Sequence, residues 1–266
     1  MAPQPPGQSP DMKYDSRIHM VTATTGWKRH CEPHYPGTNM ANEFDSLCYL
    51  CGNAIERNPR DGDMKLSMDH IPPRQFFPQP LRKEVNPNLD VAPSHKKCNN
   101  AYKDDEDYFY HSLYPLVANA NTHMAKAIFA DFARRSEKKQ TPAMLRKLFS
   151  NASGITAGGI ILPTGRIEVL VDEARIQRIA GKIARGVLFL STGICASESR
   201  IVDMRLCEEE SEVPEMYQLS WQATPIKGTY PQVFSYRHFL FEGHHIISLL
   251  FWQALMFCIT IRDGGS

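Results

Sequence analysis

The sequence predicts an α+β protein, in which a small metal-binding unit precedes linking helices and a C-terminal body of mixed helix and antiparallel sheet. Two pairs of cysteine and histidine residues, at 48–51 and 95–98, predict the small unit. A helical apolar stripe over 176–187 and strand-like apolar stretches after residue 233 predict the larger body. The 266 residues are enough for two separate cores.

Composition restricts the location and the partners that we expect. The formal net charge is +1, so nucleic-acid binding must come from local patches, and the interval 56–103 carries nine basic residues against six acidic ones. Seven cysteines, an odd number, argue against a disulfide framework and for a reducing compartment, so we expect a cytoplasmic protein. The first twelve residues contain no apolar run, so we expect no signal peptide there. The apolar stretch 246–261 is too short for a membrane span and is interrupted by Gln253, and we expect no membrane partner.

The two pairs have the spacing of a four-ligand zinc site. They read Cys48-x2-Cys51 and His95-x2-Cys98, and thiolates and imidazoles are the ligands that zinc prefers in structural sites. We therefore predict a structural Zn²⁺ on Cys48, Cys51, His95 and Cys98. The alternative for His95 is a solvated residue at the start of a helix.

Three further motifs lie inside this unit: Asp69-His70, Asn88-Leu89 and Cys98-Asn99. With these motifs in this order, the stretch 48–109 resembles the HNH endonucleases. The resemblance implies a ββα-metal fold, so the small unit is expected to be an N-terminal zinc-stapled HNH domain.

The resemblance also implies roles for residues that could be assigned in two ways. His95 fits either the zinc site or the last histidine of the HNH pattern, and we assign it to zinc because it forms a pair with Cys98. Asn99 then takes the position on the catalytic metal. Asn88 is expected to tie down the loop between the strands and to orient the base, with Asn86 as its competitor.

The chemistry of phosphodiester hydrolysis agrees with these residue types. It needs a general base for water and a cation that neutralises developing charge. His70 is the predicted base, because imidazole has an ordinary pKa of about 6.5. The carboxylate of Asp69 and the amide oxygen of Asn99 suit Mg²⁺ or Mn²⁺ as the catalytic ion. Pro72-Pro73 ends the strand, so the side chains of Asp69 and His70 are expected to reach one site.

Basic residues near this site are the expected DNA contacts. They are Arg74, Lys96, Lys97 and Lys103, although some of them could be ordinary solvated side chains. The acidic run 104–107 would repel DNA, so we expect it to face away or to mark a protein contact.

Helices and strands are expected in the rest of the chain. Residues 108–135 predict a helix broken near Pro115, and Thr141-Pro142 begins another helix. Asp172 caps a helix whose apolar stripe indicates ordinary core packing. The stretches 217–223, 233–241 and 246–261 predict strands of an antiparallel sheet.

The predicted domains are a disordered or loosely attached segment 1–40, the HNH domain 41–110, connecting helices 111–153 and a C-terminal α+β domain 154–266. The expected function is a metal-dependent endonuclease that nicks DNA once per active site, in a phage-defence or restriction-type role. A homodimer or a regulatory protein is expected to use the C-terminal domain. The alternatives are a zinc-binding, non-catalytic nucleic-acid or protein adaptor, and a nuclease that stays silent until a partner or ligand activates it.

Overall fold

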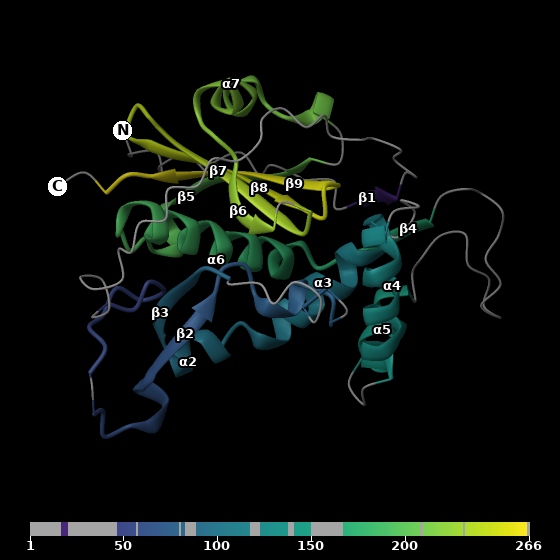
Figure 1. Ribbon diagram of the computed structural model, residues 1–266, viewed down its shortest axis with the longest axis horizontal. Helices are drawn as coiled ribbons and strands as arrows, with labels where there is room; N and C mark the ends of the chain where they lie inside the picture. The colour runs from purple at the N-terminus through teal and green to yellow at the C-terminus, as the bar shows by residue number, and fades with distance from the viewer. Residues whose placement is uncertain are drawn as a thin grey trace, which may run out of the picture.

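The chain is a mixed α+β structure with antiparallel sheets, which confirms the α+β part of the predicted fold class. The computed structural model describes residues 17–20, 47–56, 58–79, 81–82, 89–117, 123–137, 141–149, 167–207, 210–230 and 232–264. Figure 1 shows a helix, α6, lying between a sheet on one side and a small strand pair with its helices on the other. No helix within these ranges is long and apolar enough to cross a membrane.

The small module is a strand pair followed at once by a helix. Strand β2 (Leu66–His70) pairs antiparallel with β3 (Val91–His95), in a register that places Asp69 opposite Ala92. Helix α2 (Lys96–Asn100) begins directly after β3. Two 3-10 turns, η1 (Gly62–Met64) and η2 (Arg74–Phe76), flank β2. The antiparallel register places the end of β3 and the start of α2 beside the start of β2, with His95 opposite Leu66.

Three helices connect the module to the rest of the chain: α3 (Lys103–Val117), α4 (His123–Ser136) and α5 (Thr141–Phe149). The start of α5 at Thr141 is as predicted. The expected break near Pro115 is confirmed, because α3 ends at Val117 and the next helix begins at His123. The helix passes Pro115 by two residues, since a proline in the last turn removes one backbone hydrogen bond without ending a helix that is almost complete.

The C-terminal sheet has five antiparallel strands in the order β5-β9-β8-β7-β6. Strands β7 (Phe234–Phe241), β8 (His244–Phe251) and β9 (Leu255–Arg262) confirm the predictions for 233–241 and 246–261. The other two strands are β5 (Ile201–Cys207) and β6 (Lys227–Tyr230), and short 3-10 turns precede β5 and α7, namely η3 (Glu198–Arg200) and η4 (Glu210–Glu212).

The strand predicted at 217–223 is wrong, because these residues belong to helix α7 (Glu215–Ala223). Pro214 precedes the first turn, and the buried Tyr217 and Ser220 are three residues apart, which is the spacing of one helix face. A stretch this short fits both periodicities, so alternation alone could not separate them. The Tyr217 hydroxyl lies 2.8 Å from that of Thr260 on β9, which fixes α7 on the sheet face opposite α6.

Helix α6 (Glu173–Thr192) is the central element of the fold. The Asp172 side chain caps its first turn, as predicted, and Gly193 ends it in the left-handed region at φ 75°. The helix is buried from Ile179 to Phe189 because it packs against the sheet on one side and against the module on the other. The predicted apolar stripe therefore accounts for only one of the two surfaces that α6 buries.

One continuous hydrophobic core joins the module to the sheet. The ring of Phe76 in η2 stacks on Phe109 of α3, with centroids 5.1 Å apart, and lies 5.9 Å from Phe251 of β8. The indole of Trp252 donates to the Phe76 carbonyl at 3.3 Å. A separate strand pair joins an N-terminal stretch to the stretch just before α6, because β1 (Arg17–Met20) pairs antiparallel with β4 (Ile167–Leu170).

Candidate functional site

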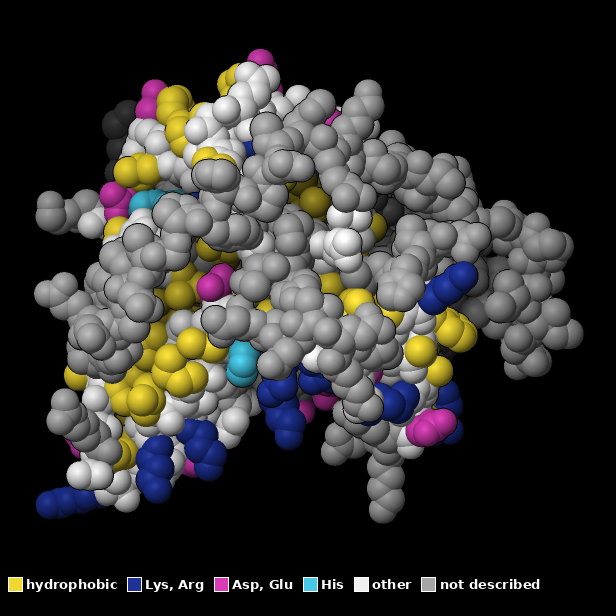
Figure 2. All heavy atoms as spheres, in the orientation of Figure 1, with side chains coloured by type: hydrophobic (Ala, Val, Ile, Leu, Met, Phe, Trp, Pro, Cys, Tyr) yellow, Lys and Arg dark blue, Asp and Glu magenta, His cyan; other side chains and the backbone are white. Residues whose placement is uncertain are grey.

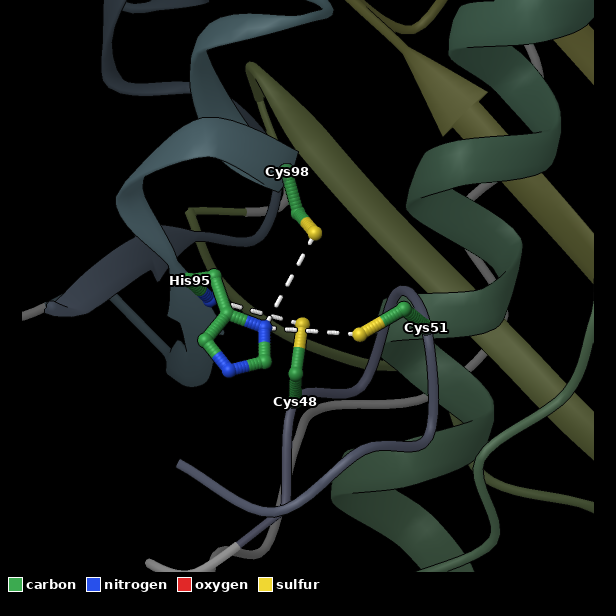
Figure 3. A group of neighbouring side chains, drawn as sticks. All are labelled: Cys48, Cys51, His95 and Cys98. Atoms are coloured by element: carbon green, nitrogen blue, oxygen red, sulfur yellow. Dashed lines mark hydrogen bonds between the residues drawn. The ribbon is translucent and has the colours of Figure 1, made fainter. Parts of the chain in front are cut away.

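The structure brings the four predicted zinc ligands together. The Sγ atoms of Cys48, Cys51 and Cys98 and a ring nitrogen of His95 all lie within 4.8 Å of one another. Figure 3 shows Cys48 and Cys51 reaching the cluster from one loop, and His95 and Cys98 reaching it from the junction of β3 and α2. The spacing of two residues in each pair lets one turn present both ligands to a common point.

Hydrogen bonds set the orientation of the His95 ring. Its Nε2 lies 3.2 Å from the Ala54 carbonyl, an acceptor that requires Nε2 to carry the proton. Nδ1 is then the unprotonated nitrogen, and it lies 3.4 Å from Cys51 Sγ and 3.9 Å from Cys98 Sγ. The backbone N–H of His95 also donates to Cys48 Sγ at 3.4 Å. A metal-bound histidine typically donates its other ring N–H to a carbonyl or carboxylate, and the Ala54 carbonyl takes that place for Nε2 of His95.

The thiols of Cys51 and Cys98 favour their protonated forms in the absence of a cation. Burial raises the pKa of Cys98 to about 12, and the charges of Cys48 and Cys51 add to the increase. Burial also raises the pKa of Cys51. Three thiolates cannot share so small a volume without positive charge, and a bound metal would supply that charge and release the protons. The cluster could therefore bind a metal ion such as zinc.

A fourth cysteine lies beside the cluster without belonging to its ligand set. Burial raises the pKa of Cys195, and the charges of Cys48 and Cys51 raise it further. Cys195 and Cys51 line a cavity of about 450 Å³ together with Tyr102 and Arg185. Because Cys195 is adjacent and yet outside the group of four, it provides a matched control for the ligands.

Asp69 is the centre of a second polar cluster. Its side chain is 6% exposed, and its Oδ2 accepts a hydrogen bond from the Tyr49 hydroxyl at 2.6 Å and lies 2.8 Å from Nζ of Lys182. Tyr49 lies between Cys48 and Cys51. The loop 48–51, which we call the metal-ligand loop, therefore contacts this carboxylate directly. Burial raises the pKa of Tyr49 well above its usual value, and the charge of Asp69 raises it further, so the phenol keeps the proton that it donates.

The ammonium of Lys182 joins Asp69 to two other side chains. It lies 2.5 Å from Oε1 of Glu106 on α3 and donates to Oδ1 of Asn99 on α2 at 3.2 Å. The Lys182 side chain is 0% exposed and comes from α6. Asp69 and Asn99, which the sequence predicted to share a divalent cation, thus share the ammonium of Lys182. Glu106 and Lys182 were not among the predicted site residues.

These contacts decide how the cluster fits Mg²⁺ or Mn²⁺. Oδ2 of Asp69 and Oδ1 of Asn99 are the oxygens expected to bind the ion, and both already bind Lys182. A divalent ion at these oxygens would lie against the ammonium and be repelled by it. The donor set does not fit a divalent ion while Lys182 is in place, and the predicted Mg²⁺ or Mn²⁺ stays a prediction.

His70 lies next to Asp69 at the end of β2 and differs from it in environment. Successive strand residues point to opposite faces, and Asp69 is buried while His70 is half-buried. Burial lowers the pKa of His70, Arg74 lowers it further, and Asp69 opposes the shift. The imidazole is therefore neutral at neutral pH. No hydrogen bond joins its ring to the Asp69 cluster within the described part of the chain.

The four predicted DNA contacts are exposed around the module. Arg74 lies in η2, Lys96 and Lys97 begin α2, and Lys103 begins α3. Lys96 forms a loose ion pair with Asp63, at 3.7 Å. Figure 2 shows Lys and Arg side chains at the lower edge of this face, next to apolar side chains. The exposed apolar residues of β2 are Leu66 and Met68.

The acidic run 104–107 contacts helix α6. Asp105 forms ion pairs with Arg175, at 2.5 Å, and with Arg178. Glu106 binds Lys182, as described above. The expected protein contact of this run is therefore made inside the same chain.

Arg185, one turn after Lys182, ties α6 to the metal-ligand loop. Its buried guanidinium donates to the Leu50 carbonyl, to the Ala196 carbonyl at 2.6 Å and to the Tyr102 hydroxyl at 3.3 Å. The only sequence signal for this contact was the run 182–186, Lys-Ile-Ala-Arg-Gly, which combines two basic residues with a glycine in an otherwise apolar helix.

Two predicted residues have no structural description. Asn88, expected to orient the base, and its competitor Asn86 lie outside the described residues. Their roles stay predictions that follow from the resemblance alone.

No protein-family model matches the chain, and no curated protein or solved structure is significantly similar to it. The resemblance to the HNH endonucleases therefore rests on the motif residues of the sequence alone and stays an expectation.

Proposed function

We propose that the chain is a zinc-stapled phosphodiester hydrolase of the HNH type that acts on DNA. One observation supports this most strongly: Asp69 and Asn99 converge on one cation, at 2.8 Å and 3.2 Å from the same nitrogen. They lie on different elements, β2 and α2, and the motif pattern predicts that this pair shares a cation. A coincidental resemblance gives no reason for the two side chains to meet.

His70 takes the role of general base. Because burial and Arg74 hold its pKa below the ordinary value, the imidazole is unprotonated at neutral pH and can accept a proton from water. It is half-buried, so water reaches it, and it directly follows the Asp69 position on β2. Arg74, Lys96, Lys97 and Lys103 would hold the DNA backbone around it.

In this proposal the Cys48, Cys51, His95 and Cys98 cluster holds a structural Zn²⁺. All four positions are filled by protein ligands, which is the arrangement of closed structural sites rather than of catalytic ones. The ion would join the loop before β2 to the start of α2, and so fix the two elements that carry Asp69 and Asn99. With one centre per chain, one strand is nicked per engagement, and cutting both strands requires a dimer or two events.

A second candidate function is the zinc-binding, non-catalytic adaptor. The contacts of Asp69 favour it, because Tyr49 and Lys182 satisfy the carboxylate without a substrate or a metal. In that case Asp69 is a structural residue, and the module binds nucleic acid or protein without cutting it.

Incubation of the purified protein with supercoiled plasmid tests the proposal, in Mg²⁺, in Mn²⁺ and in EDTA. We expect metal-dependent nicking that falls by about 10²–10⁴-fold in His70→Ala, with zinc content and fold retained. His244→Ala, a histidine of the C-terminal sheet, is the matched control and should cut like the parent. Plasmid that stays intact with both the parent and Lys182→Met, which removes the ammonium beside Asp69, would reject a hydrolase that is active on its own. That result in either metal would favour the adaptor or a nuclease that needs a partner.

A further inference from the structure

The surroundings of Lys182 form a complete oxygen site for a cation. Three oxygens, from Asp69, Glu106 and Asn99, lie between 2.5 and 3.2 Å from Nζ. An ammonium has three donors, and these oxygens account for all of them. The Tyr102 ring adds a cation–π contact at 5.2 Å. Carboxylate and amide oxygens are also the ligands that Mg²⁺ and Mn²⁺ prefer.

The charges of this site are unequal. Two carboxylates, Asp69 and Glu106, face one ammonium, and Asn99 is neutral, so the group carries one negative charge in excess when both acids are ionised. Gln75 donates a further hydrogen bond to the other oxygen of Glu106, at 3.0 Å. A divalent cation in place of the ammonium would neutralise the site completely.

The ammonium and the oxygens come from different parts of the chain. The three oxygens belong to β2, α2 and α3, beside the metal-ligand loop, whereas Lys182 belongs to α6. The ammonium reaches the three oxygens only because α6 packs against the module. Arg175 and Arg178 on the same helix bind Asp105, which holds α6 at this distance.

We propose that Asp69, Asn99 and Glu106 form a divalent-cation site in which Lys182 is a built-in competitor, so that a metal enters only when the ammonium leaves. A role of this site in catalysis rests on the proposed function, whereas the competition between Lys182 and a metal ion does not. Lys182 would regulate access of Mg²⁺ or Mn²⁺ to the centre through the position of α6. Glu106 would be a third ligand beside the two that the motifs predict.

Binding of Mn²⁺ to the zinc-loaded, full-length protein, followed by electron paramagnetic resonance, tests this inference. Lys182→Met removes the charge and keeps much of the side-chain volume, so we expect Mn²⁺ affinity to rise by at least about 100-fold over the parent. Lys182→Arg keeps the positive charge and should show no such gain. Adding Asp69→Asn to Lys182→Met should abolish the new site.

A second measurement covers the case in which Lys182→Met does not fold without metal. Two unpaired carboxylates then repel each other, and Mn²⁺ should restore the cooperative thermal transition of this variant while leaving the parent's midpoint unchanged. The inference is overturned if folded Lys182→Met binds Mn²⁺ no better than the parent, if Mn²⁺ does not rescue an unfolded variant, or if the parent itself binds Mn²⁺ tightly in an Asp69-dependent way. Each result is obtained without a cleavage assay, so loss of the hydrolase proposal leaves it testable.

Discussion

The module contains two polar clusters that are built in opposite ways. The Cys48, Cys51, His95 and Cys98 cluster consists only of metal-ligating side chains, and all four come from the loop before the module and from the junction of β3 and α2. The Asp69 cluster draws its oxygens from β2, α2 and α3 and its positive charge from α6. The first cluster could take its positive charge only from a bound metal ion, whereas the second has the ammonium of Lys182, which belongs to the chain. Two clusters that both attract cations can therefore depend on metal to very different degrees.

The two clusters are neighbours and share connections. Tyr49 of the metal-ligand loop donates to Asp69, and Arg185, one turn after Lys182, donates to the Leu50 carbonyl in the same loop. A disturbance of either cluster is expected to reach the other through these two contacts. The following predictions compare the clusters, from the largest expected effect to the smallest.

Loss of a zinc ligand should have the largest effect. Structural zinc contributes on the order of 10 kcal/mol to folding, which is comparable to the whole stability of a domain. We expect Cys98→Ser to lose zinc and the cooperative unfolding of the module, measured by metal analysis and thermal denaturation with and without chelator. Cys195→Ser, beside the cluster, should keep both properties. A zinc-free Cys98→Ser protein with the parent's unfolding midpoint would contradict the assignment.

Removal of the Asp69 carboxylate should come second. Breaking a buried ion pair by deleting one partner costs roughly 3–5 kcal/mol, because the remaining charge is left without compensation. We expect a loss of this size in Asp69→Ala by chemical denaturation, with zinc still bound. The control is Asp63→Ala, whose ion pair with Lys96 is mostly exposed and should contribute at most about 1 kcal/mol. Equal losses in the two variants would show that the Asp69 cluster is not a buried ionic group.

The close contact between α6 and the module gives a third test. A Cβ on Gly186 would lie 2.5 Å from Cδ1 of Ile71, directly after His70. Overpacking of this kind costs about 1–3 kcal/mol, so Gly186→Ala should be destabilised by that amount. Gly62→Ala, where a Cβ meets nothing within 4 Å, should be unchanged or slightly more stable. A Gly186→Ala protein as stable as the parent would mean that α6 does not hold the module at this distance.

A rise in pH should lower the stability that the Asp69 cluster contributes and raise the zinc affinity of the cysteine cluster. These are the smallest effects of the series. Burial raises the pKa of Glu106, although Lys182 opposes the shift. Its contribution to stability is therefore greatest below the unfolded-state value of about 4.3 and is lost as the pH rises through the folded-state value. The unfolding free energy of the parent should thus fall relative to Glu106→Gln over this range, with Glu215→Gln as the exposed control.

Zinc affinity should instead increase with pH, because the thiols of Cys51 and Cys98, whose pKa values are raised, must lose protons to bind. Competition with a chelator at about pH 6 and about pH 8 measures this trend. Zinc affinity that is the same at both values would contradict a thiolate site.

The cluster of Cys48, Cys51, His95 and Cys98 and much of the fold could be predicted from the sequence. Two residues separate the ligands in each pair, so local geometry alone brings Cys48 near Cys51 and His95 near Cys98. Capping by Asp172 and the apolar periods of α6, β7 and β9 were likewise local. The second cluster could be predicted only in part, because Lys182 meets Asp69 through the packing of α6. A lysine in an apolar helix predicts burial next to an acid, but not which acid. The alternation in 217–223 led to a wrong strand prediction for a related reason. In so short a stretch, packing against the rest of the protein decides between helix and strand.

The continuous core has a consequence for how such a protein can be divided. A fragment cut after residue 110 would lose Phe251 and Trp252, which cover Phe76 and Phe109, and would leave Asp69 and Glu106 without a counter-ion. Transfer of residues 48–110 alone into another protein would therefore move the motif residues without the packing that supports them. The part of the chain that has to stay together extends from the loop 48–51 to β9.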